Sequence, residues 1–237
     1  MNLSFNHLTS NVADGNMSYI YGSQSEVFNS RSRFFSRHTL EIEDSVWMLA
    51  EHGEIIARVC ASNRQLGLYT QADAVRADAL ITCDSRLTLA LLTADCMPVV
   101  LYSPEVSVLA LVHVGWKNID NNLLVKVVNK LATDYGAEPS KIEVSIGPHI
   151  SKKSYCVSNP TQTHKHEWQP FLTKANSGFY IDIAGFALIQ LESTGIKKEH
   201  IHMSPVDTVT SEEYFSHHRG SRSGKAMGRF LTLAKMH

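Results

Sequence analysis

The stretch MPVVLYSPEVSVLALVH, residues 97–113, decides the fold of this chain. It holds two apolar runs on either side of Ser103-Pro104-Glu105-Val106. Four residues of this kind form the loop of a β-hairpin, because proline and polar residues favour turns. Both runs are apolar without alternation, so we expect a hairpin that is covered on both faces.

The register of this hairpin brings two reactive side chains together. If Tyr102 pairs with Ser107, the same register continued outward places Cys96 opposite His113. Directly opposed residues have Cβ atoms about 4.5 to 5.5 Å apart, which suits two ligands of one metal ion. A bulge at Pro98 would shift this pairing by one residue. The sequence thus predicts a cysteine and a histidine at the open end of one hairpin.

Around the hairpin, short apolar runs of strand length are mixed with segments of helical period. Residues 119–136, IDNNLLVKVVNKLATDYG, have apolar side chains at three- and four-residue intervals and predict one helix that ends at Gly136. Residues 60–77 have the character of a surface insertion. The other predicted elements are strands at 46–50, 55–59, 78–82, 87–92, 141–146, 200–203 and 230–234, and helices at 182–194 and 212–218, the second opened by a capping box of Thr210 and Glu213.

This mixture of hairpins and helices lacks the strict βαβ alternation of a doubly wound sheet. No repeat, low-complexity tract or linker divides the chain. We therefore expect residues 1–237 to form a single layered α/β domain.

Composition narrows the classes of protein and partner. The 22 Lys and Arg residues and 23 Asp and Glu residues give a net charge of −1, without the positive field that nucleic-acid binding needs. No apolar run is long enough to span a bilayer, and the first residues lack the pattern of a secretory signal. We expect a cytoplasmic protein that binds neither nucleic acid nor membrane, with the monomer as the favoured oligomeric state. The four cysteines form no Cys-x-x-Cys pair and are expected to be reduced thiols.

Cys96, His113 and His52 form the candidate chemical site. Cys96 lies in a polar break between two apolar runs, His113 lies where its run stops, and His52 lies on a Glu-His-Gly turn. One cysteine and two histidines with an open fourth position match the ligand count of a catalytic zinc site. The alternative is structural, with Cys96 as a small buried side chain and His113 as a hydrogen-bonded edge histidine.

Six blocks of the sequence carry a resemblance to a known family. They are EHGEIIARV (51–59), ADALIT (77–82), TADCMPVVLY (93–102), HVGWKN (113–118), SIGPHISKKSYCV (145–157) and YFSHHRGSRSGKAMGRF (214–230). In order and spacing they resemble the multicopper polyphenol oxidase or laccase-domain family. That family is also called the peptidoglycan editing factor family, and its members are also called purine nucleoside phosphorylases. The resemblance runs from about Trp47 to the last residue.

The resemblance implies a laccase-domain-like fold of two mixed β-sheets flanked by helices, and a zinc site made by His52, Cys96 and His113. Copper is the weaker alternative, because a multicopper oxidase needs many more clustered histidines. The implied reaction is phosphorolysis of purine nucleosides such as adenosine, inosine, guanosine and methylthioadenosine. It consumes phosphate and gives a free base and ribose 1-phosphate, with deamination of adenosine as a second activity. Each ligand histidine is expected to have an acidic or carbonyl partner on its other ring nitrogen.

Asp95 and Trp116 flank these residues and are candidates for substrate contact. Asp95 is placed to handle a proton or to contact the ribose, and its alternative role is to accept hydrogen bonds from turn amides beside Cys96. Trp116 is a candidate to stack on a purine. His217 and His218 are adjacent in the chain, so at most one of them is expected to face the site.

A basic loop near the C-terminus is the candidate phosphate site. Arg219, Arg222, Lys225 and Arg229 lie among glycine and serine residues there. Guanidinium groups and exposed amides bind phosphate well, so Arg219 and Arg229 are candidates to hold it, although such loops are commonly only solvated.

Two other classes of function stay open. The first is a metal-free cysteine hydrolase or amidase in which Cys96 is the nucleophile and His113 its base. The second is a non-enzymatic metal-binding protein. The metal content of the active protein distinguishes a cysteine hydrolase from a zinc enzyme. Catalytic turnover distinguishes either enzyme from a non-enzymatic metal-binding protein.

Overall fold

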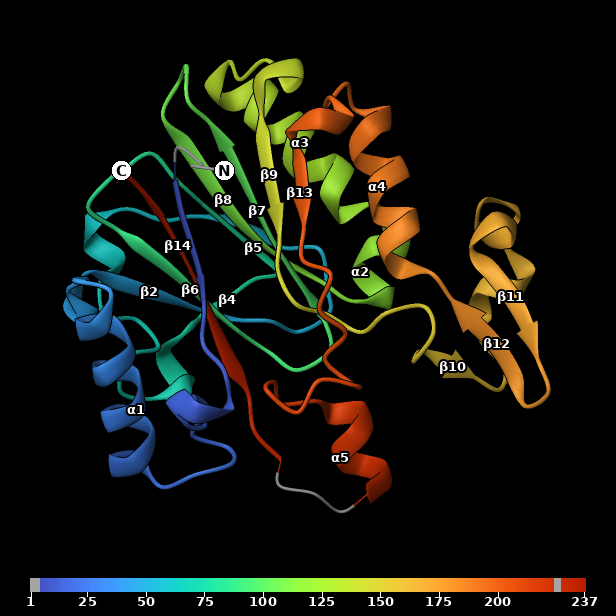
Figure 1. The fold of residues 1–237 in the computed structure, drawn as a ribbon. Helices are drawn as coiled ribbons and strands as arrows, with labels where there is room; N and C mark the ends of the chain where they lie inside the picture. Colours follow the sequence, from blue (N-terminus) through green and yellow to red (C-terminus); the bar gives the residue numbers. More distant parts are fainter. Residues whose placement is uncertain (1–4, 224–226) are drawn as a thin grey trace.

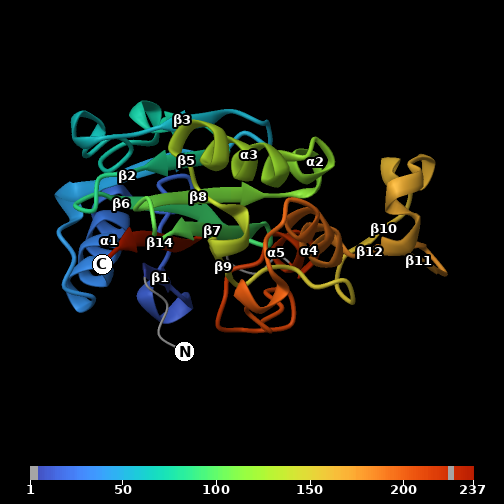
Figure 2. The same ribbon diagram turned by 90° about the horizontal axis from the view of Figure 1, so that it is seen from above.

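Two large β-sheets pack face to face, and helices cover their outer faces (Figures 1 and 2). This arrangement is seen in a computed structural model, which describes residues 5–223 and 227–237. The predicted layered α/β architecture is therefore confirmed, as are the two mixed sheets that the resemblance implied.

The first sheet has five strands and joins the two ends of the described chain. Its order is β1 (Phe5–Thr9), β14 (Phe230–Met236), β6 (Thr88–Thr93), β2 (Ser45–Leu49) and β4 (Val75–Arg76). β14 is antiparallel to both of its neighbours, whereas β2 is parallel to β6 and to β4. The last strand of the chain thus lies between the first strand and β6.

The second sheet has six strands and contains the predicted hairpin. Its order is β13 (Ile201–Met203), β9 (Glu143–Ile146), β7 (Met97–Ser103), β8 (Val108–Val114), β5 (Ala79–Thr82) and β3 (Ile56–Arg58). Every residue of β7 and β8 is buried, as expected for a hairpin that is covered on both faces.

The predicted register of the hairpin is wrong by two residues. Ser103 pairs with Val108, and Pro98 pairs with His113, so Cys96 lies before β7 and is not opposite His113. The loop is residues 104–107 because proline, with its fixed φ, begins the turn and Ser107 takes a positive φ of 48°.

Three apolar clusters make up the core of the described part of the chain. The first cluster lies between the two sheets and includes Leu89 and Val100. The second packs the outer face of the six-stranded sheet against α2 (Trp116–Asp120), α3 (Leu123–Tyr135) and α4 (Ile183–Ser193). The third packs the outer face of the five-stranded sheet against α1 (Gln24–Arg37), a helix that the sequence analysis did not predict.

The segment 119–136, predicted as one helix, forms two. Asn122 has a φ of 58° and interrupts the backbone between α2 and α3, while Gly136 ends α3 as predicted. The prediction for α4 is confirmed, with Asp182 accepting a hydrogen bond from the Gly185 amide at its start.

Two further predictions are wrong. Residues 60–77 are not only a surface insertion, because Leu68 is fully buried and β4 joins the first sheet. Residues 212–216 are not helical, and α5 (His217–Ser223) begins almost where the predicted helix ends. The Ser216 hydroxyl, rather than Thr210, accepts the hydrogen bond of an amide in the first turn, that of Arg219.

A third, small sheet extends from the body beside α4 (Figure 1). Its strands, in the order β10 (Cys156–Val157), β12 (Gly178–Ile181) and β11 (Leu172–Ala175), are antiparallel. Short 3₁₀ segments occur at Val12–Asp14, Ile42–Asp44, Ala61–Asn63, Gln71–Asp73, Pro139–Lys141, Thr161–His164, His166–Phe171 and Lys198–His200. Within the described residues, none of the helices has the length and apolar character needed to cross a bilayer.

Candidate functional site

The candidate site lies where the chain passes from one large sheet to the other. β6 of the first sheet leads through Ala94, Asp95 and Cys96 into β7 of the second sheet. His113 lies one residue before the end of β8. His52 lies in the connection that leaves β2. Three distant parts of the sequence thus supply the side chains of one site.

The structure brings the predicted ligand residues together. One ligand atom from each of His52, Cys96 and His113 lies within 4.8 Å of the other two. The close approach depends on Gly115, because a Cβ atom there would lie 3.0 Å from His52 Nδ1 and 3.3 Å from Cys96 Sγ. The opposed register predicted from the hairpin does not create this proximity. It arises because the bend before β7 and the connection after β2 both return to the end of β8.

Asp78, which the sequence analysis did not single out, organises two of these residues. Its carboxylate is buried and accepts hydrogen bonds from the amides of His52 at 3.0 Å and Gly53 at 2.8 Å. It also accepts hydrogen bonds from His113 Nδ1 at 2.8 Å and from the Asn118 side chain at 3.1 Å. These bonds hold His52 in a left-handed conformation with a φ of 59°. In the sequence, Asp78 is marked only as a single carboxylate at the start of a buried strand.

The hydrogen bond to Asp78 also sets the tautomer of His113. A carboxylate accepts, so Nδ1 of His113 carries the proton and Nε2 is left for Cys96 and a metal ion. Burial alone would lower the pKa of His113, but the neighbouring Cys96 and the bond to Asp78 outweigh it and raise the pKa to about 9. Near pH 7 the metal-free ring therefore also carries a proton on Nε2, and a metal ion would bind there by displacing that proton. The expected acidic partner is therefore present for His113. Within residues 5–223 and 227–237, the ring of His52 has no such hydrogen bond.

The pKa values of Asp78 and His52 are both lowered, but for different physical reasons. Burial would raise the pKa of Asp78, but hydrogen bonds from His113 and from the Gly53 amide outweigh it, and the pKa lies below its usual value. Burial and the nearby His113 both lower the pKa of His52. A neutral imidazole is the form that binds a metal ion, so this environment favours His52 as a ligand.

Asp95 connects residues 94–96, which we call the Cys96 bend, to the C-terminal part of the chain. Its carboxylate accepts hydrogen bonds from the Thr208 hydroxyl at 2.7 Å and from the His218 amide at 2.6 Å. Its φ of 85° is unusual for a residue with a side chain. Both carboxylate oxygens are thus used within the protein, which favours a positioning role over the proton-handling role considered from the sequence.

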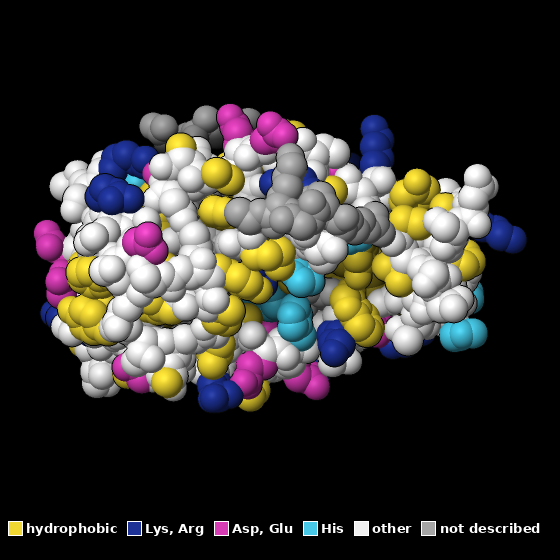
Figure 3. All heavy atoms as spheres, turned by 90° about the horizontal axis from the view of Figure 1, so that it is seen from below, with side chains coloured by type: hydrophobic (Ala, Val, Ile, Leu, Met, Phe, Trp, Pro, Cys, Tyr) yellow, Lys and Arg dark blue, Asp and Glu magenta, His cyan; other side chains and the backbone are white. Residues whose placement is uncertain are grey.

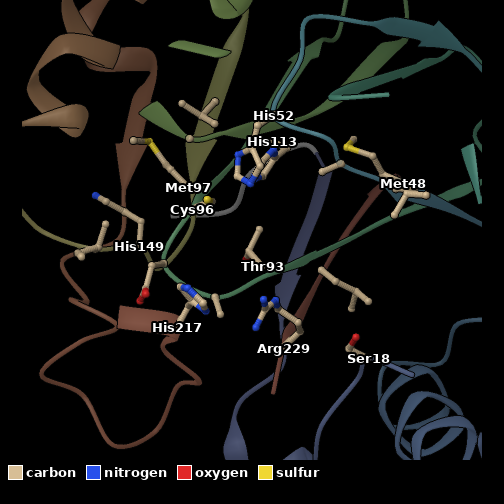
Figure 4. Close-up of a pocket in the computed structure, with 18 of the residues that line it drawn as sticks. Ser18, Met48, His52, Thr93, Cys96, Met97, His113, His149, His217 and Arg229 are labelled. Atoms are coloured by element: carbon tan, nitrogen blue, oxygen red, sulfur yellow. The ribbon is translucent and has the colours of Figure 1, made fainter. Parts of the chain in front are cut away.

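A cavity of about 520 Å³ opens over the ligand residues. Figure 3 shows histidine and apolar side chains gathered near the middle of the face on which this cavity lies. In Figure 4, His52, Cys96 and His113 lie at one side, with His217 and Arg229 across from them and Thr93 between. Apolar side chains line the rest of the wall, among them Ile20, Met48, Leu49, Ala74, Trp116, Ile150 and Ile183.

The basic C-terminal residues have different environments. Arg229 lines the cavity, and its guanidinium donates to the Tyr21 hydroxyl at 3.1 Å. Arg219 does not line it, because its guanidinium donates to the carbonyl oxygens of four residues between 208 and 214. Those bonds hold the loop before α5, so Arg219 is better explained as a structural residue than as the phosphate ligand considered above. Lys225 and the side chain of Arg222 lie outside the described residues.

His149 is a cavity residue that the sequence analysis missed. It follows β9 and is buried, with 6% of its surface exposed. Nδ1 lies 2.8 Å from the Gly147 carbonyl oxygen. Burial lowers the pKa of His149, so its ring is neutral near pH 7. The sequence offered only its place in the block SIGPHISKKSYCV.

The donor set fits a single metal ion of the kind that imidazole and thiolate bind. Zinc accepts both donors, and three protein ligands leave a position open for a further ligand. Of the residues that the structure describes, only His52, Cys96 and His113 form a cluster of at least three such donors. A multicopper centre would need more histidines than this cluster has.

Comparison with known proteins identifies the family. The family described as multi-copper polyphenol oxidoreductase laccase matches residues 8–237. The chain belongs to this family. Among its relatives, purine nucleoside phosphorylase YlmD of Geobacillus stearothermophilus is 28% identical over 218 residues, covering 89% of this chain and 78% of that protein. A purine nucleoside phosphorylase of Streptomyces coelicolor is 30% identical over 186 residues, covering 77% of this chain and 73% of that protein.

Solved structures confirm the laccase-family fold. The crystal structure of YlmD from Geobacillus stearothermophilus has a TM-score of 0.88 at 26% identity and covers 98% of this chain and 91% of its own. The hypothetical protein YfiH of Bacillus licheniformis has a TM-score of 0.87 at 24% identity, with 94% of this chain and 85% of its own covered. The second likeness concerns the fold alone.

Proposed function

We propose that this protein is a zinc-dependent purine nucleoside phosphorylase. The observation that carries the proposal is the position of the His52, Cys96 and His113 set in a cavity whose opposite side presents Arg229 and His217 (Figure 4). A cation site facing basic side chains suits a substrate pair of a nucleoside and a phosphate ion. The names of the relatives, purine nucleoside phosphorylases, support the same reaction.

Zinc held by one thiolate and two neutral imidazoles would supply a Lewis acid with a net charge near +1. The remaining work belongs to the side chains of the cavity. Arg229 would bind phosphate through its guanidinium, and His217 would add a hydrogen bond from the same side. The apolar wall and Trp116 would hold the purine and exclude water from the reacting carbon.

In phosphorolysis, the bond between C1′ and the purine nitrogen breaks with its electron pair on the base, and a phosphate oxygen bonds to C1′. The sugar gains positive charge as the base leaves, so a phosphate fixed beside C1′ both attacks and stabilises it. Asp95 contributes indirectly, because its hydrogen bonds to Thr208 and to the His218 amide join the Cys96 bend to α5. We therefore propose Asp95 as a positioning residue.

The test is a product analysis of the zinc-loaded protein with adenosine, inosine and methylthioadenosine, with and without phosphate. We expect release of free base that requires phosphate and yields ribose 1-phosphate. Release that is unchanged in phosphate-free buffer and yields free ribose would instead identify a hydrolase. Inosine formed from adenosine would establish deamination as a second activity.

A pair of arginine variants tests the phosphate site. Arg229→Met should raise the phosphate concentration needed for half-maximal rate by about tenfold or more, because a charge-assisted contact is lost. Arg86→Met is the matched control, since Arg86 is exposed and pairs with Asp84 away from the cavity. An equal phosphate requirement in both variants would remove Arg229 from the proposed site.

A further inference from the structure

Backbone hydrogen bonds hold His149 at its place in the cavity wall. Its carbonyl oxygen accepts a hydrogen bond from the Thr208 amide at 3.1 Å, and its amide lies 3.4 Å from the Val206 carbonyl oxygen. The next residue, Ile150, donates its amide to the Asp95 carbonyl oxygen at 2.9 Å. The backbone of His149 is therefore tied to the same segments that hold the Cys96 bend.

The ring of His149 is fixed in one tautomer. Nδ1 lies 2.8 Å from the Gly147 carbonyl oxygen, and a carbonyl oxygen only accepts, so Nδ1 carries the ring proton. Because the ring is neutral, Nε2 carries a lone pair and is an acceptor. Within the described part of the chain, no donor is bonded to Nε2. Nor is Nε2 one of the enclosed polar atoms that lack a partner, so it is accessible, on a side chain that lines the cavity.

We infer that His149 Nε2 accepts a hydrogen bond from the bound nucleoside and positions it in the cavity. This inference rests on the proposed function, because it takes a purine nucleoside as the occupant. A nucleoside offers two kinds of donor, the ribose hydroxyl groups and the N–H groups of the base. We expect a ribose hydroxyl, since all purine nucleosides carry it, whereas inosine has an N1–H group that adenosine lacks.

Two variants separate the acceptor from the structural hydrogen bond. In His149→Asn the amide nitrogen can still donate to the Gly147 carbonyl oxygen, but no atom reaches the position of Nε2. In His149→Gln the longer side chain can place an oxygen near that position, but the bond to Gly147 is lost. We expect the Asn variant to bind inosine about tenfold more weakly or worse, and the Gln variant to stay within about threefold of the wild type.

The measurement is equilibrium binding of inosine to the zinc-loaded protein by isothermal titration calorimetry, without turnover. Zinc content and thermal unfolding are measured on each variant, so that a loss of metal or fold is recognised. Wild-type affinity in the Asn variant would overturn the inference. Equal losses in both variants with unchanged zinc content and unfolding would also overturn it, because they would assign the ring a packing role.

Substrate analogues test the same contact on the wild-type protein, so the result does not depend on how well a variant folds. The sugar arm uses 2′-, 3′- and 5′-deoxyinosine, and the base arm uses 1-methylinosine. The analogue that lacks the bonded donor should bind the wild type about tenfold more weakly, and His149→Asn should bind it as well as it binds inosine. If every analogue binds the wild type as inosine does, no donor contacts His149 and the inference fails. If inosine itself does not bind, the proposed function fails with it, whereas nucleoside binding without phosphorolysis would leave the inference intact.

Discussion

Replacing Asp78 by Asn should weaken metal binding while leaving every proposed metal ligand in the sequence. One carboxylate oxygen would become an NH₂ group. Suppose that the remaining oxygen still accepts the hydrogen bonds from the His52 amide and the His113 ring. The NH₂ group then faces the Gly53 amide, which now lies 2.8 Å from the carboxylate, and two donors oppose each other. A buried donor without an acceptor costs about 1 to 3 kcal/mol, and the bond to His113 also loses its charge.

These losses act on the orientation of His52 and on the tautomer of His113, so they appear largely as lost metal affinity. We expect the affinity for zinc to fall about 10- to 100-fold, as found for groups that orient metal ligands, which corresponds to about 1.4 to 2.8 kcal/mol. The assay is competition for zinc against a chromophoric chelator, with thermal unfolding measured in parallel. Asp84→Asn is the matched control, because Asp84 pairs with Arg86 on the surface. Zinc affinity of Asp78→Asn within threefold of the wild type would refute the reasoning.

Three other perturbations test the site and the fold. Cys96→Ser should lose both zinc and activity, whereas full activity of a verified metal-free wild type, with a covalent adduct on Cys96 during turnover, would establish a cysteine hydrolase. Arg31→Met should lower the free energy of unfolding by about 3 to 5 kcal/mol in urea, because the buried guanidinium donates to three carbonyl oxygens, while exposed Arg33→Met should change it by less than about 0.5 kcal/mol. Burial lowers the pKa of His7 to about 4 from an unfolded value of 6.5, so stability should fall as pH falls from about 6.5 towards 4, by about 2 kcal/mol between pH 7 and 5. Replacing His7 by Gln should remove that part of the pH dependence, and an unchanged slope would contradict it.

The sequence predicts best the features that depend on neighbours in the chain. The apolar period of α3, the extent of α4 and the hairpin of β7 and β8 all follow from local patterns. The register of that hairpin was wrong because a shift of two residues keeps the same side chains on the same face. Only the turn distinguishes the two registers, and Pro104 at its start decides between them.

The parts that escaped prediction depend on contacts between distant residues. Helix α1 has a weak apolar stripe, and its buried Arg31 is stabilised by carbonyl oxygens from two other segments and by the rings of Tyr19 and Trp47. Asp78 and His149 have no local pattern that marks a role, since their partners lie in other strands and loops. The three proposed metal ligands were identified because their types and family blocks are distinctive, but no local rule places them within 4.8 Å.

The position of β14 has a consequence for how the protein folds during its synthesis on the ribosome. β14 lies between β1 and β6, so the first strand has no partner in its sheet until residues 230–236 leave the exit tunnel. During synthesis the nascent chain must carry β1 and one edge of β6 as unpaired strands, which are the surfaces that drive aggregation. A chain truncated shortly before residue 230 would contain almost every residue that lines the cavity, yet it could not close the five-stranded sheet.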